Sequence, residues 1–320
     1  MNKKIHIAAC FDKGYLMPTG VMIYSACINN PDVDISFHLV VDESVTENDK
    51  KDLVETASSF KGKEVLFYTV DSHLYDKFPL INSKYITRAT YYRIFLSEIL
   101  PDSVDKVIYL DGDCIVRHSL MSLWNTDISE KAIAAVFDAF EGIPYHYNHL
   151  FYPPKLGYFN AGVLFINLNY WRKHHVIDAL MEYLSKYPER IIMEDQDLLN
   201  VVLRDVKMSI HPKYNFQTDM LRCEPHFYYW GYEEEIKEAI ADPVIMHFTS
   251  RVKPWHTDII IPHPYRSSFF KYQNETKWKG DKINNFQFKR KIKKYIDSFL
   301  RLIKIRPPRM PFYIEVPPID

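Results

Sequence analysis

The chain has 320 residues and a formal net charge of −1, with 47% hydrophobic and 25% charged residues. These proportions are typical of a globular protein of one or two domains, and they argue against a disordered chain. No apolar run approaches the roughly 20 residues that a membrane span needs, and the first residues hold no apolar stretch of signal-peptide length. We therefore expect a cytoplasmic protein.

The four cysteines are widely spaced and form no Cys-x-x-Cys pair. This spacing predicts reduced, buried thiols and neither a disulfide framework nor a zinc site. The residues concerned are Cys10, Cys27, Cys114 and Cys223.

Short apolar runs typical of strands alternate along the chain with segments of helical periodicity. Because elements that alternate at this spacing form a parallel sheet with crossover helices, the pattern predicts a doubly wound α/β domain. Strands are predicted at residues 4–10, 35–41, 64–70, 104–110, 132–138, 161–168 and 243–248. Helices are predicted at about 19–28, after Ser44 or Thr46, over 86–100, from Tyr170 past Leu184, and over 194–203.

The composition changes beyond Pro254, where aromatic and basic residues become frequent. Residues 289–309 hold nine basic residues and one acid, a net charge of +8, and since the whole chain carries −1, the remainder carries −9. We predict a main domain over residues 1–255 and a helical, basic extension over residues 256–320.

Two carboxylates separated by one glycine, Asp111, Gly112 and Asp113, directly follow the predicted strand 104–110. Ligands in open α/β sheets bind beyond the carboxyl ends of the strands, and the glycine lets a ligand approach the backbone. Carboxylates suit Mg²⁺ or Mn²⁺, and such an ion can hold a diphosphate. The alternative is an ordinary turn, because Asp-Gly-Asp is also common turn chemistry.

His247 ends the last predicted strand, and Lys253 follows six residues later, before Pro254 and Trp255. An ion held by two aspartates could take a nitrogen from His247, which favours Mn²⁺ over Mg²⁺, and Lys253 could neutralise a phosphate. The alternatives are a structural histidine and a solvated surface lysine.

Residues 194–197 read Glu-Asp-Gln-Asp at the start of a predicted helix. The helix dipole favours each acid there by ~0.3–1 kcal/mol, but it gives no reason for Gln196 between Asp195 and Asp197. This glutamine would add an amide to the polar array.

Asn160 precedes two small residues, Ala161 and Gly162, so a ligand could approach the backbone beside its amide. The alternative is an asparagine that satisfies a loop backbone.

Six stretches together resemble the retaining nucleotide-sugar glycosyltransferases of family 8, which include glycogenin and the bacterial lipopolysaccharide galactosyl- and glucosyltransferases. They span roughly residues 5 to 275, and the pattern is more similar to the lipopolysaccharide core enzymes than to glycogenin. The stretches are HIAACFDKGYLMPTGVMIYSA, TRATYYRIFL, VIYLDGDCIV, YFNAGVLFINL, EDQDLLN and HFTSRVKPWH.

This resemblance implies a GT-A type fold of Rossmann-like character and transfer of glucose or galactose from a UDP-sugar to a saccharide or lipid-linked acceptor, in lipopolysaccharide or other cell-surface glycan synthesis. It implies that Asp111, Asp113 and His247 hold Mn²⁺, with Mg²⁺ as an alternative, and that Lys253 contacts phosphate. The implied donor-site residues are Ala8, Ala9, Asp12, Tyr15, Arg88, Gly112, Asn160, Ala161, Asp195 and Gln196.

Two details of this implied site stay open. Many relatives have AADDNY where this chain has AACFDKGY, so the acid that reads the uracil is Asp12 in a lengthened loop or is missing. Asp195 and Gln196 are the implied catalytic residues near the anomeric carbon. Retention normally asks for a carboxylate nucleophile, but an amide is a poor one, so we favour front-face attack with the leaving phosphate as base.

Residues 286–306 predict a basic amphipathic helix, whose apolar positions recur at helical spacing. Such a helix can lie on an anionic membrane, each charge contributing about 1 kcal/mol, or can dock on the protein's own body. The membrane alternative would place the protein on the cytoplasmic face of the inner membrane. The apolar positions are Ile292, Tyr295, Ile296, Phe299 and Ile303.

Three other functions are weighed against this one. A metal-dependent nucleotidyltransferase would need a basic or glycine-rich triphosphate loop, which AACFDKGY is not. A catalytically inactive sugar-binding protein would have lost the paired aspartates or the histidine, and this chain keeps both. Nucleic-acid binding is not expected, because the chain outside the basic segment is acidic.

Overall fold

The computed structural model describes residues 4–75, 78, 88–139, 145–221, 231–250, 252–257, 263–283 and 288–306, with side-chain surroundings for all of these except 74–75, 145–146 and 288–294. The predicted free thiols of Cys10, Cys27 and Cys114 are confirmed and buried. Cys223 and the side chain of Ile292 lie outside the described residues.

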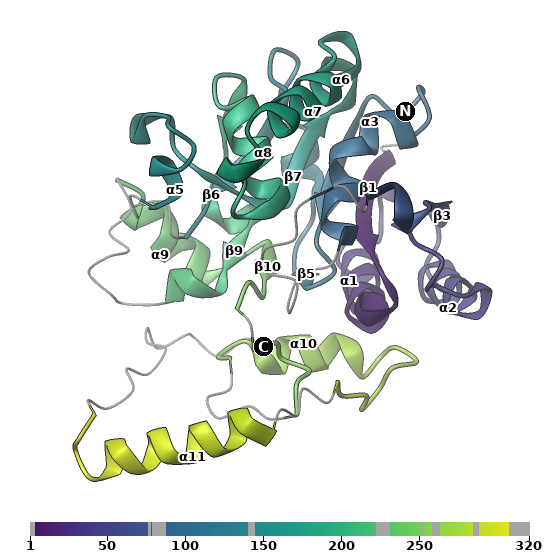
Figure 1. Ribbon diagram of the computed structural model, residues 1–320. Coiled ribbons are helices and arrows are strands. Elements are labelled where there is room, and N and C mark those ends of the chain that lie inside the picture. The colour runs from purple at the N-terminus through teal and green to yellow at the C-terminus, as the bar shows by residue number, and fades with distance from the viewer. Residues whose placement is uncertain are drawn as a thin grey trace.

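A seven-stranded sheet in the order β3-β2-β1-β4-β7-β6-β8 forms the centre of the protein (Figure 1). Most of its strand residues are apolar and buried, which gives a sheet covered on both faces. Its strands are β1 (Lys4–Phe11), β2 (Asp34–Val41), β3 (Lys63–Thr69), β4 (Lys106–Leu110), β6 (Ile133–Phe137), β7 (Phe159–Asn167) and β8 (Lys207–Ser209).

The predicted α/β fold with a mostly parallel sheet is confirmed, since β3, β2, β1 and β4 run parallel, as do β6 and β8. β7, however, runs antiparallel to both β4 and β6, so the simple parallel crossover pattern ends there. Both β6 and β7 are continuous apolar runs, and such runs carry no information about strand direction.

A second, three-stranded sheet lies beside the carboxyl end of β4, in the order β5-β10-β9. β5 (Cys114–Val116) directly follows the Asp-Gly-Asp turn, and it pairs antiparallel with β10 (Ile245–His247) so that Cys114 faces His247. β9 (Phe216–Gln217) pairs with the other edge of β10. This small sheet brings His247 to the paired aspartates.

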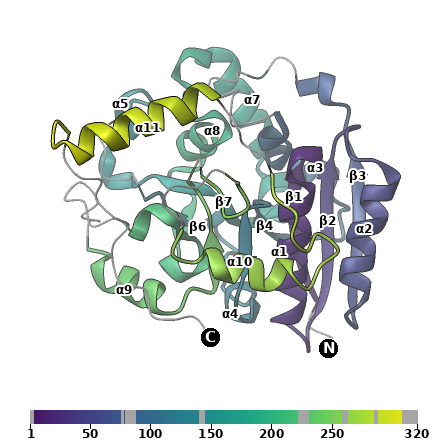
Figure 2. The same cartoon turned by 90° about the horizontal axis from the view of Figure 1, so that it is seen from below.

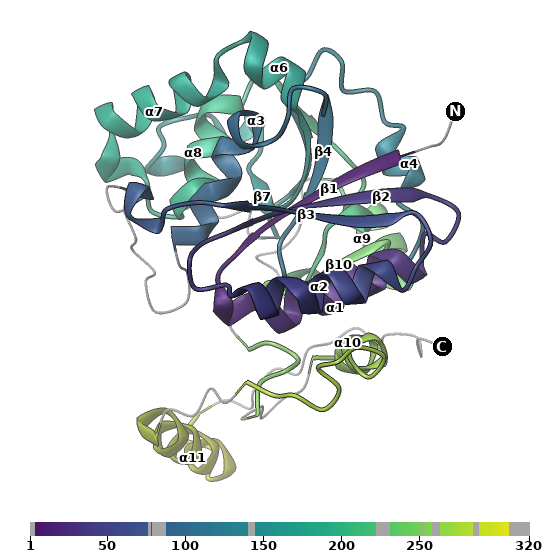
Figure 3. The same cartoon turned by 90° about the vertical axis from the view of Figure 1, so that its right-hand side faces the viewer.

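Helices cover both faces of the large sheet (Figure 3). α1 and α2 lie on one face, and α3, α6, α7 and α8 lie on the other. The bounds are α1 (Leu16–Ile28), α2 (Glu47–Ser58), α3 (Leu96–Ile99), α4 (Met121–Trp124), α5 (Tyr145–Asn148), α6 (Leu168–Lys173), α7 (Val176–Lys186), α8 (Glu194–Leu203) and α9 (Glu233–Ala241). Within the described residues, short 3-10 helices occur at Lys13–Tyr15, Ser72–Tyr75, Arg88–Phe95, Pro154–Leu156, Pro188–Arg190, Pro212–Tyr214 and Thr218–Leu221.

Two predicted helices differ from the structure. Within the predicted helix 86–100, the described residues 88–95 form a 3-10 helix, in which Arg93 Nε donates to the Thr90 carbonyl that Ile94 would use in an α-helix. The helix predicted from Tyr170 is broken into α6 and α7 at His175, whose backbone is left-handed (φ 50°).

Residues 263–283 pack against α1 (Figure 2). α10 (Arg266–Gln273) contributes the buried Phe269, and Trp278 lies so close to Gly20 that a Cβ there would be 2.0 Å from the indole ring. The sequence-based boundary near residue 255 stays a prediction, but the residues just beyond it share the core of the main domain.

α11 (Phe288–Leu302) lies apart from the large sheet (Figures 1 and 3), as a helix in the place where the sequence predicts one. Its described apolar side chains face solvent, with Phe299 59% and Leu302 79% exposed. In the part of the chain that the structure describes, no helix has both the length and the apolarity to cross a membrane.

Candidate active site

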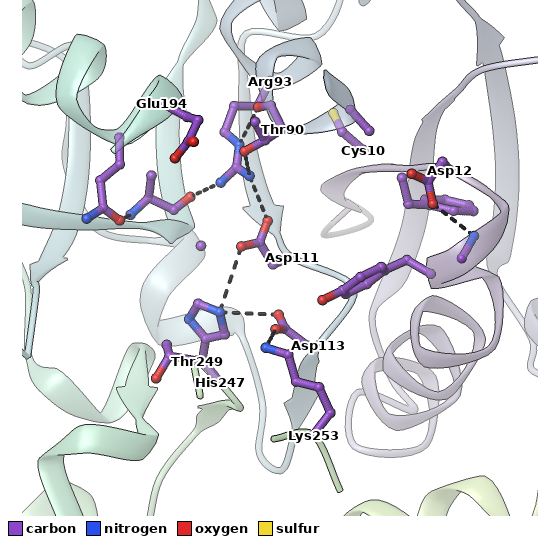
Figure 4. A pocket seen from close by; sticks show the side chains of 18 of the residues that line it. Cys10, Asp12, Thr90, Arg93, Asp111, Asp113, Glu194, His247, Thr249 and Lys253 are labelled. Carbon is purple, nitrogen blue, oxygen red and sulfur yellow. Dashed lines mark hydrogen bonds and ion pairs between the residues drawn. The ribbon is translucent and has the colours of Figure 1, made fainter. Parts of the chain in front are cut away.

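A pocket of about 560 Å³ lies at the carboxyl ends of β1 and β4, between the start of α8 and the 3-10 helix Lys13–Tyr15 (Figure 4). Eleven of the fourteen expected donor-site residues line it, whereas Arg88 does not, and Ala8 and Ala9 are fully buried inside β1. The expected residues that line it are Asp12, Tyr15, Asp111, Gly112, Asp113, Asn160, Ala161, Asp195, Gln196, His247 and Lys253.

The two aspartates and the histidine converge on one point of this pocket (Figure 4). His247 Nε2 lies 3.2 Å from Asp113 Oδ1 and 3.7 Å from Asp111 Oδ2. The main chain fixes this arrangement, because Asp111 N donates to the Gly162 carbonyl at 2.8 Å and β5 pairs with β10. The Asp-Gly-Asp turn is therefore held from both sides.

The donor set and the space around it fit a divalent cation. Asp113 Oδ1 is buried and accepts no hydrogen bond, which is costly for a carboxylate unless a cation compensates it. A Cβ on Gly162 would lie 2.0 Å from His247 Cε1 and 2.8 Å from Asp111 Oδ2, so the glycine leaves room for the three donors to approach. Two carboxylates and one imidazole suit Mn²⁺.

Cys114 is a further donor near this point, because its Sγ lies within 4.8 Å of ligand atoms of Asp113 and His247. Burial, together with the two nearby carboxylates, raises the pKa of the Cys114 thiol well above its usual value. A thiol that keeps its proton is a poor ligand, so Asp111 is better suited than Cys114 to complete the set.

Lys253 contacts Asp113 through the carboxylate oxygen that does not face His247. Its Nζ donates to Asp113 Oδ2 at 2.5 Å and to the Phe248 carbonyl at 2.6 Å. Burial opposes the charged ammonium, but Asp113, Tyr15 and Asp111 together outweigh burial and raise the pKa of Lys253. Burial likewise opposes the charge of Asp113, while the Lys253 ammonium together with its neighbours outweighs burial and lowers the pKa of that carboxyl. A buried positive charge thus stands beside the candidate metal site.

Arg93 connects this cluster to α8, and sequence reasoning missed it by choosing Arg88 from the same stretch. Its guanidinium contacts Asp111 Oδ1 at 3.1 Å and Asp195 Oδ2 at 3.0 Å, and it donates to the Ala161 carbonyl at 2.5 Å. A signal was present, because an arginine inside the apolar run YYRIF is buried and must find charged partners.

Asp195 is buried at the first turn of α8, beside Thr90 and Arg93. Thr90 Oγ1 donates to Oδ1 at 2.5 Å, and Arg93 pairs with Oδ2. Burial raises the pKa of Asp195 to about 6, although Arg93 and Thr90 act in the opposite direction.

The Gln196 amide is held at both ends. Its Oε1 accepts from Ala161 N at 3.0 Å, and its Nε2 donates to Asp138 Oδ2 at 3.2 Å. Asn160 Nδ2 donates to the same Asp138 oxygen at 3.1 Å. Asp138, at the end of β6, was not predicted, because a single acid after a strand carries no signal in one sequence.

The turn into α8 is strained, because buried Glu194 has a left-handed backbone (φ 48°), which costs a non-glycine residue about 1–3 kcal/mol. Fully buried Asp197 holds this turn, since it accepts from Ile192 N, Met193 N and Tyr158 Oη at 2.8, 2.7 and 2.6 Å. The anchored turn places Glu194, Asp195 and Gln196 along the pocket wall.

The opposite wall is built by the loop after β1 (Figure 4). Asp12 Oδ1 accepts from Gly14 N at 2.8 Å and caps the following 3-10 helix. Tyr15 packs edge-on against Trp255, and burial raises the pKa of its phenol to about 12. This wall combines an acid with aromatic rings.

Comparison with known proteins places the chain in one family. The model of the family described as Glycosyl transferase family 8 matches residues 6–258. Over 279 residues the chain is 32% identical to the general stress protein A of Bacillus subtilis, covering 86% of this chain and 94% of the relative. Over 265 residues it is 29% identical to a lipopolysaccharide 1,3-galactosyltransferase of Salmonella typhimurium, covering 79% and 74% of the two chains.

Solved structures share the fold. The galactosyltransferase LgtC, in complex with donor and acceptor sugar analogues, superposes with a TM-score of 0.76 at 27% identity, over 86% of this chain and 99% of that chain. The glycosyltransferase GlyE of Streptococcus pneumoniae superposes with a TM-score of 0.61 at 21% identity, over 93% of this chain and 64% of that chain.

Proposed function

This chain belongs to glycosyl transferase family 8, has a GT-A type fold and is a glycosyltransferase, and from the geometry of its pocket we propose that it moves glucose or galactose from a UDP-sugar to a saccharide acceptor with retention. The convergence of Asp111, Asp113 and His247 beside Lys253 carries this proposal. A relative named as a lipopolysaccharide galactosyltransferase supports an acceptor in lipopolysaccharide or another cell-surface glycan.

We assign Mn²⁺ to Asp111, Asp113 and His247, with Mg²⁺ as the less favoured ion because of the nitrogen ligand. When bound, such an ion stabilises negative charge on the leaving diphosphate. Lys253 pairs with the other oxygen of Asp113 and adds a second positive charge beside this site, which needs no proton transfer to act.

The two walls of the pocket are assigned to different parts of the donor, one to the uridine and the other to the sugar. Asp12 and Tyr15 are assigned to uridine, because an acid and an aromatic ring suit a base. Asn160, with the backbone of Ala161, is assigned to the sugar. Arg93 takes the sugar-site role that the resemblance gives to Arg88, since Arg93 lines the pocket and Arg88 does not.

Retention follows from front-face attack in this proposal. Gln196 is an amide and therefore a poor nucleophile, and its Oε1 already accepts from a backbone N–H. The hydrogen bond from Thr90 and the ion pair with Arg93 weaken the Asp195 carboxylate as a nucleophile. Both instead orient the sugar, while the acceptor hydroxyl attacks on the face from which UDP departs and gives its proton to the leaving phosphate. A glycosyl adduct trapped on Asp195 or Gln196 would contradict this mechanism.

The experiment is UDP release from UDP-glucose, UDP-galactose and other UDP-sugars by the purified protein, with Mn²⁺ and with EDTA. We expect the protein to release UDP from a UDP-hexose only when the ion is present. The rate of this release should fall at least about 100-fold in Asp113→Asn, because the ion then loses a charged ligand. Lys237→Gln, which changes an exposed pair with Glu234 on α9, serves as the control. Release that is unchanged by EDTA contradicts the metal assignment.

We also propose that α11 rests on an anionic membrane surface. Tyr295, Ile296, Phe299 and Leu302 are all more than half exposed, and the sequence surrounds them with basic residues. Basic amphipathic helices with an exposed apolar face bind such surfaces. A lipid-linked acceptor would then be met at the cytoplasmic face of the inner membrane, which is where we expect the protein.

Co-sedimentation with vesicles tests this surface. We expect the protein to bind phosphatidylglycerol vesicles at low salt, to bind phosphatidylcholine vesicles weakly, and to lose binding when Phe299→Asp and Leu302→Asp are combined. Equal binding of the double variant and the wild type would contradict the role of α11.

A further inference from the structure

Asn215 lies behind the metal site, on the side of His247 that faces away from the aspartates. It is fully buried, between the 3-10 helix Pro212–Tyr214 and β9. Because β9 pairs in parallel with β10, the Asn215 side chain meets the ring of His247, and Nδ1 of the ring lies 3.0 Å from Asn215 Oδ1.

A chain of buried hydrogen bonds runs from this contact to the sugar side of the pocket. Asn215 Nδ2 donates to Asn160 Oδ1 at 3.0 Å, and Asn160 Nδ2 donates to Asp138 Oδ2 at 3.1 Å. Asp138 Oδ2 also accepts a hydrogen bond from Gln196 Nε2, so this chain of hydrogen bonds ends at a residue assigned to the transfer reaction.

The direction of every hydrogen bond in this chain is determined by groups that can act in only one way. Gly162 N can only donate, and it donates to Asn160 Oδ1 at 3.0 Å, so the oxygen of Asn160 faces Gly162 and Asn215. The group of Asn215 that faces this oxygen must then be its NH₂. Its carbonyl oxygen is left to face His247, and that oxygen can only accept. His247 Nδ1 therefore carries the hydrogen.

This protonation pattern leaves the Nε2 lone pair of a neutral His247 ring aimed at the two aspartates, 3.2 Å from Asp113 Oδ1 and 3.7 Å from Asp111 Oδ2. Three electron-pair donors that face one another need a cation between them. The hydrogen-bond chain thus selects the form of His247 that binds a metal.

We propose that Asn215 is a positioning residue with two separable tasks, an inference that rests on the proposed function. Its carbonyl fixes the metal-binding tautomer of His247, and its NH₂ group holds Asn160 in place for the donor sugar. The side chain thereby connects the ion site to the sugar site through one buried amide.

Two substitutions at this position separate the tasks. Asn215→Asp keeps an acceptor for His247 Nδ1–H but replaces the donor to Asn160 with a second acceptor. We expect it to bind Mn²⁺ at least as tightly as the wild type and to lose the difference in affinity between UDP-sugar and UDP. Asn215→Leu removes both hydrogen bonds, and we expect its affinity for Mn²⁺ to fall roughly 10–100-fold, as for other lost partners of metal-bound histidines.

Free Mn²⁺ is measured by its electron paramagnetic resonance signal during titration without nucleotide, and UDP, UDP-glucose and UDP-galactose are titrated by calorimetry in the presence of Mn²⁺. Asn200→Leu is the matched control, because Asn200 is equally buried but bonds only to backbone groups of Phe159 and Gln196. We expect this variant to lose stability and to keep its affinity for Mn²⁺.

The results of these titrations distinguish a failure of the proposed function from a failure of the role of Asn215. Wild-type protein that binds no Mn²⁺ contradicts the proposed function itself. Wild-type protein that binds Mn²⁺ while Asn215→Leu binds it equally well contradicts only the role of Asn215, as does an Asn215→Asp protein that loses Mn²⁺. If Asn215→Leu does not fold, Asn215→Asp decides alone, by retained Mn²⁺ binding together with a lost preference for UDP-sugar over UDP.

Discussion

At the scale of single residues, the site contains a positive charge of its own where an ion and a diphosphate would bind. Lys253 holds Asp113 Oδ2 at 2.5 Å, while Oδ1 of the same carboxylate faces His247. An ion that enters this point must share Asp113 with the ammonium. A diphosphate would instead attract Lys253 and release the carboxylate.

This competition predicts effects of opposite sign for Lys253→Met. Without nucleotide the variant should bind Mn²⁺ about tenfold more tightly, because a hydrogen bond between charged groups contributes about 1.5–3 kcal/mol and about 1.4 kcal/mol corresponds to a factor of ten. With Mn²⁺ present it should bind UDP more weakly. Both affinities come from calorimetry, with Lys237→Gln as a control for the lost charge. Weaker Mn²⁺ binding without nucleotide would refute the competition.

At the scale of elements, the first three strands carry a polar chain on the sheet, in which His38 is buried and His6 and Tyr68 are half-buried. His38 Nε2 lies 2.9 Å from His6 Nδ1, and His38 Nδ1 lies 2.9 Å from Tyr68 Oη. Burial, aided by His6, lowers the pKa of His38 to about 4. The folded protein thus favours the neutral ring, so this contribution to stability is fully present above pH 6.5 and is lost as the pH falls toward 4.

We therefore expect acid to destabilise the wild type more than His38→Gln. The difference between their free energies of unfolding should shrink by up to about 3 kcal/mol between pH 7 and pH 4, which is the full value of the pKa shift. Urea unfolding at both pH values measures it. Parallel pH dependence of the two proteins would show that His38 is not responsible.

The segment beyond residue 255 contributes to the core through Trp278, which is 7% exposed and packs on Gly20 of α1. Trp278→Ala should lower the free energy of unfolding by about 3–5 kcal/mol, as for other buried aromatic residues. Trp278→Phe keeps most of the contact and should cost less. Urea unfolding that shows a loss below 1 kcal/mol for Trp278→Ala would mean that this segment does not stabilise the main domain.

The elements themselves could be predicted better than their arrangement. The run before Asp111 and the acids of α8 fix a strand and a helix from local pattern alone, and both are present. The pairing of β5 with β10 could not be predicted, because it joins two three-residue strands that are distant in sequence. The antiparallel direction of β7 could not be predicted either, because a strand that is apolar and buried on both faces carries no pattern that indicates its direction.

For the site, the residues of strong motifs were found and isolated ones were missed. The paired aspartates, Gln196 and Lys253 could be singled out because each lies in a distinctive sequence motif. Asp138 and Asn215 did not, because their roles exist only through hydrogen bonds to distant residues. The resemblance gave Arg88 for the sugar site, whereas Arg93 is the arginine that lines the pocket, and one sequence shows the burial of Arg93 only through its apolar neighbours.

At the scale of the whole molecule, charge and apolar surface are divided between two regions. The segment 289–309 carries +8 and the rest of the chain −9. The helix α11 lies apart from the sheet (Figure 1), and its Tyr295, Phe299 and Leu302 side chains are exposed. A body that repels an anionic surface and a helix that binds one would together orient the molecule on it. The pocket of the acidic body would stay accessible to a soluble nucleotide sugar.

The proposed reaction depends on one ion bound by three side chains that are far apart in the sequence. A crystal grown with Mn²⁺ and UDP, measured at the manganese absorption edge, tests this directly. We predict a single strong anomalous peak between Asp111, Asp113 and His247, in contact with the diphosphate. UDP bound in the pocket with no manganese peak at these three side chains, or with the peak elsewhere, would contradict the account.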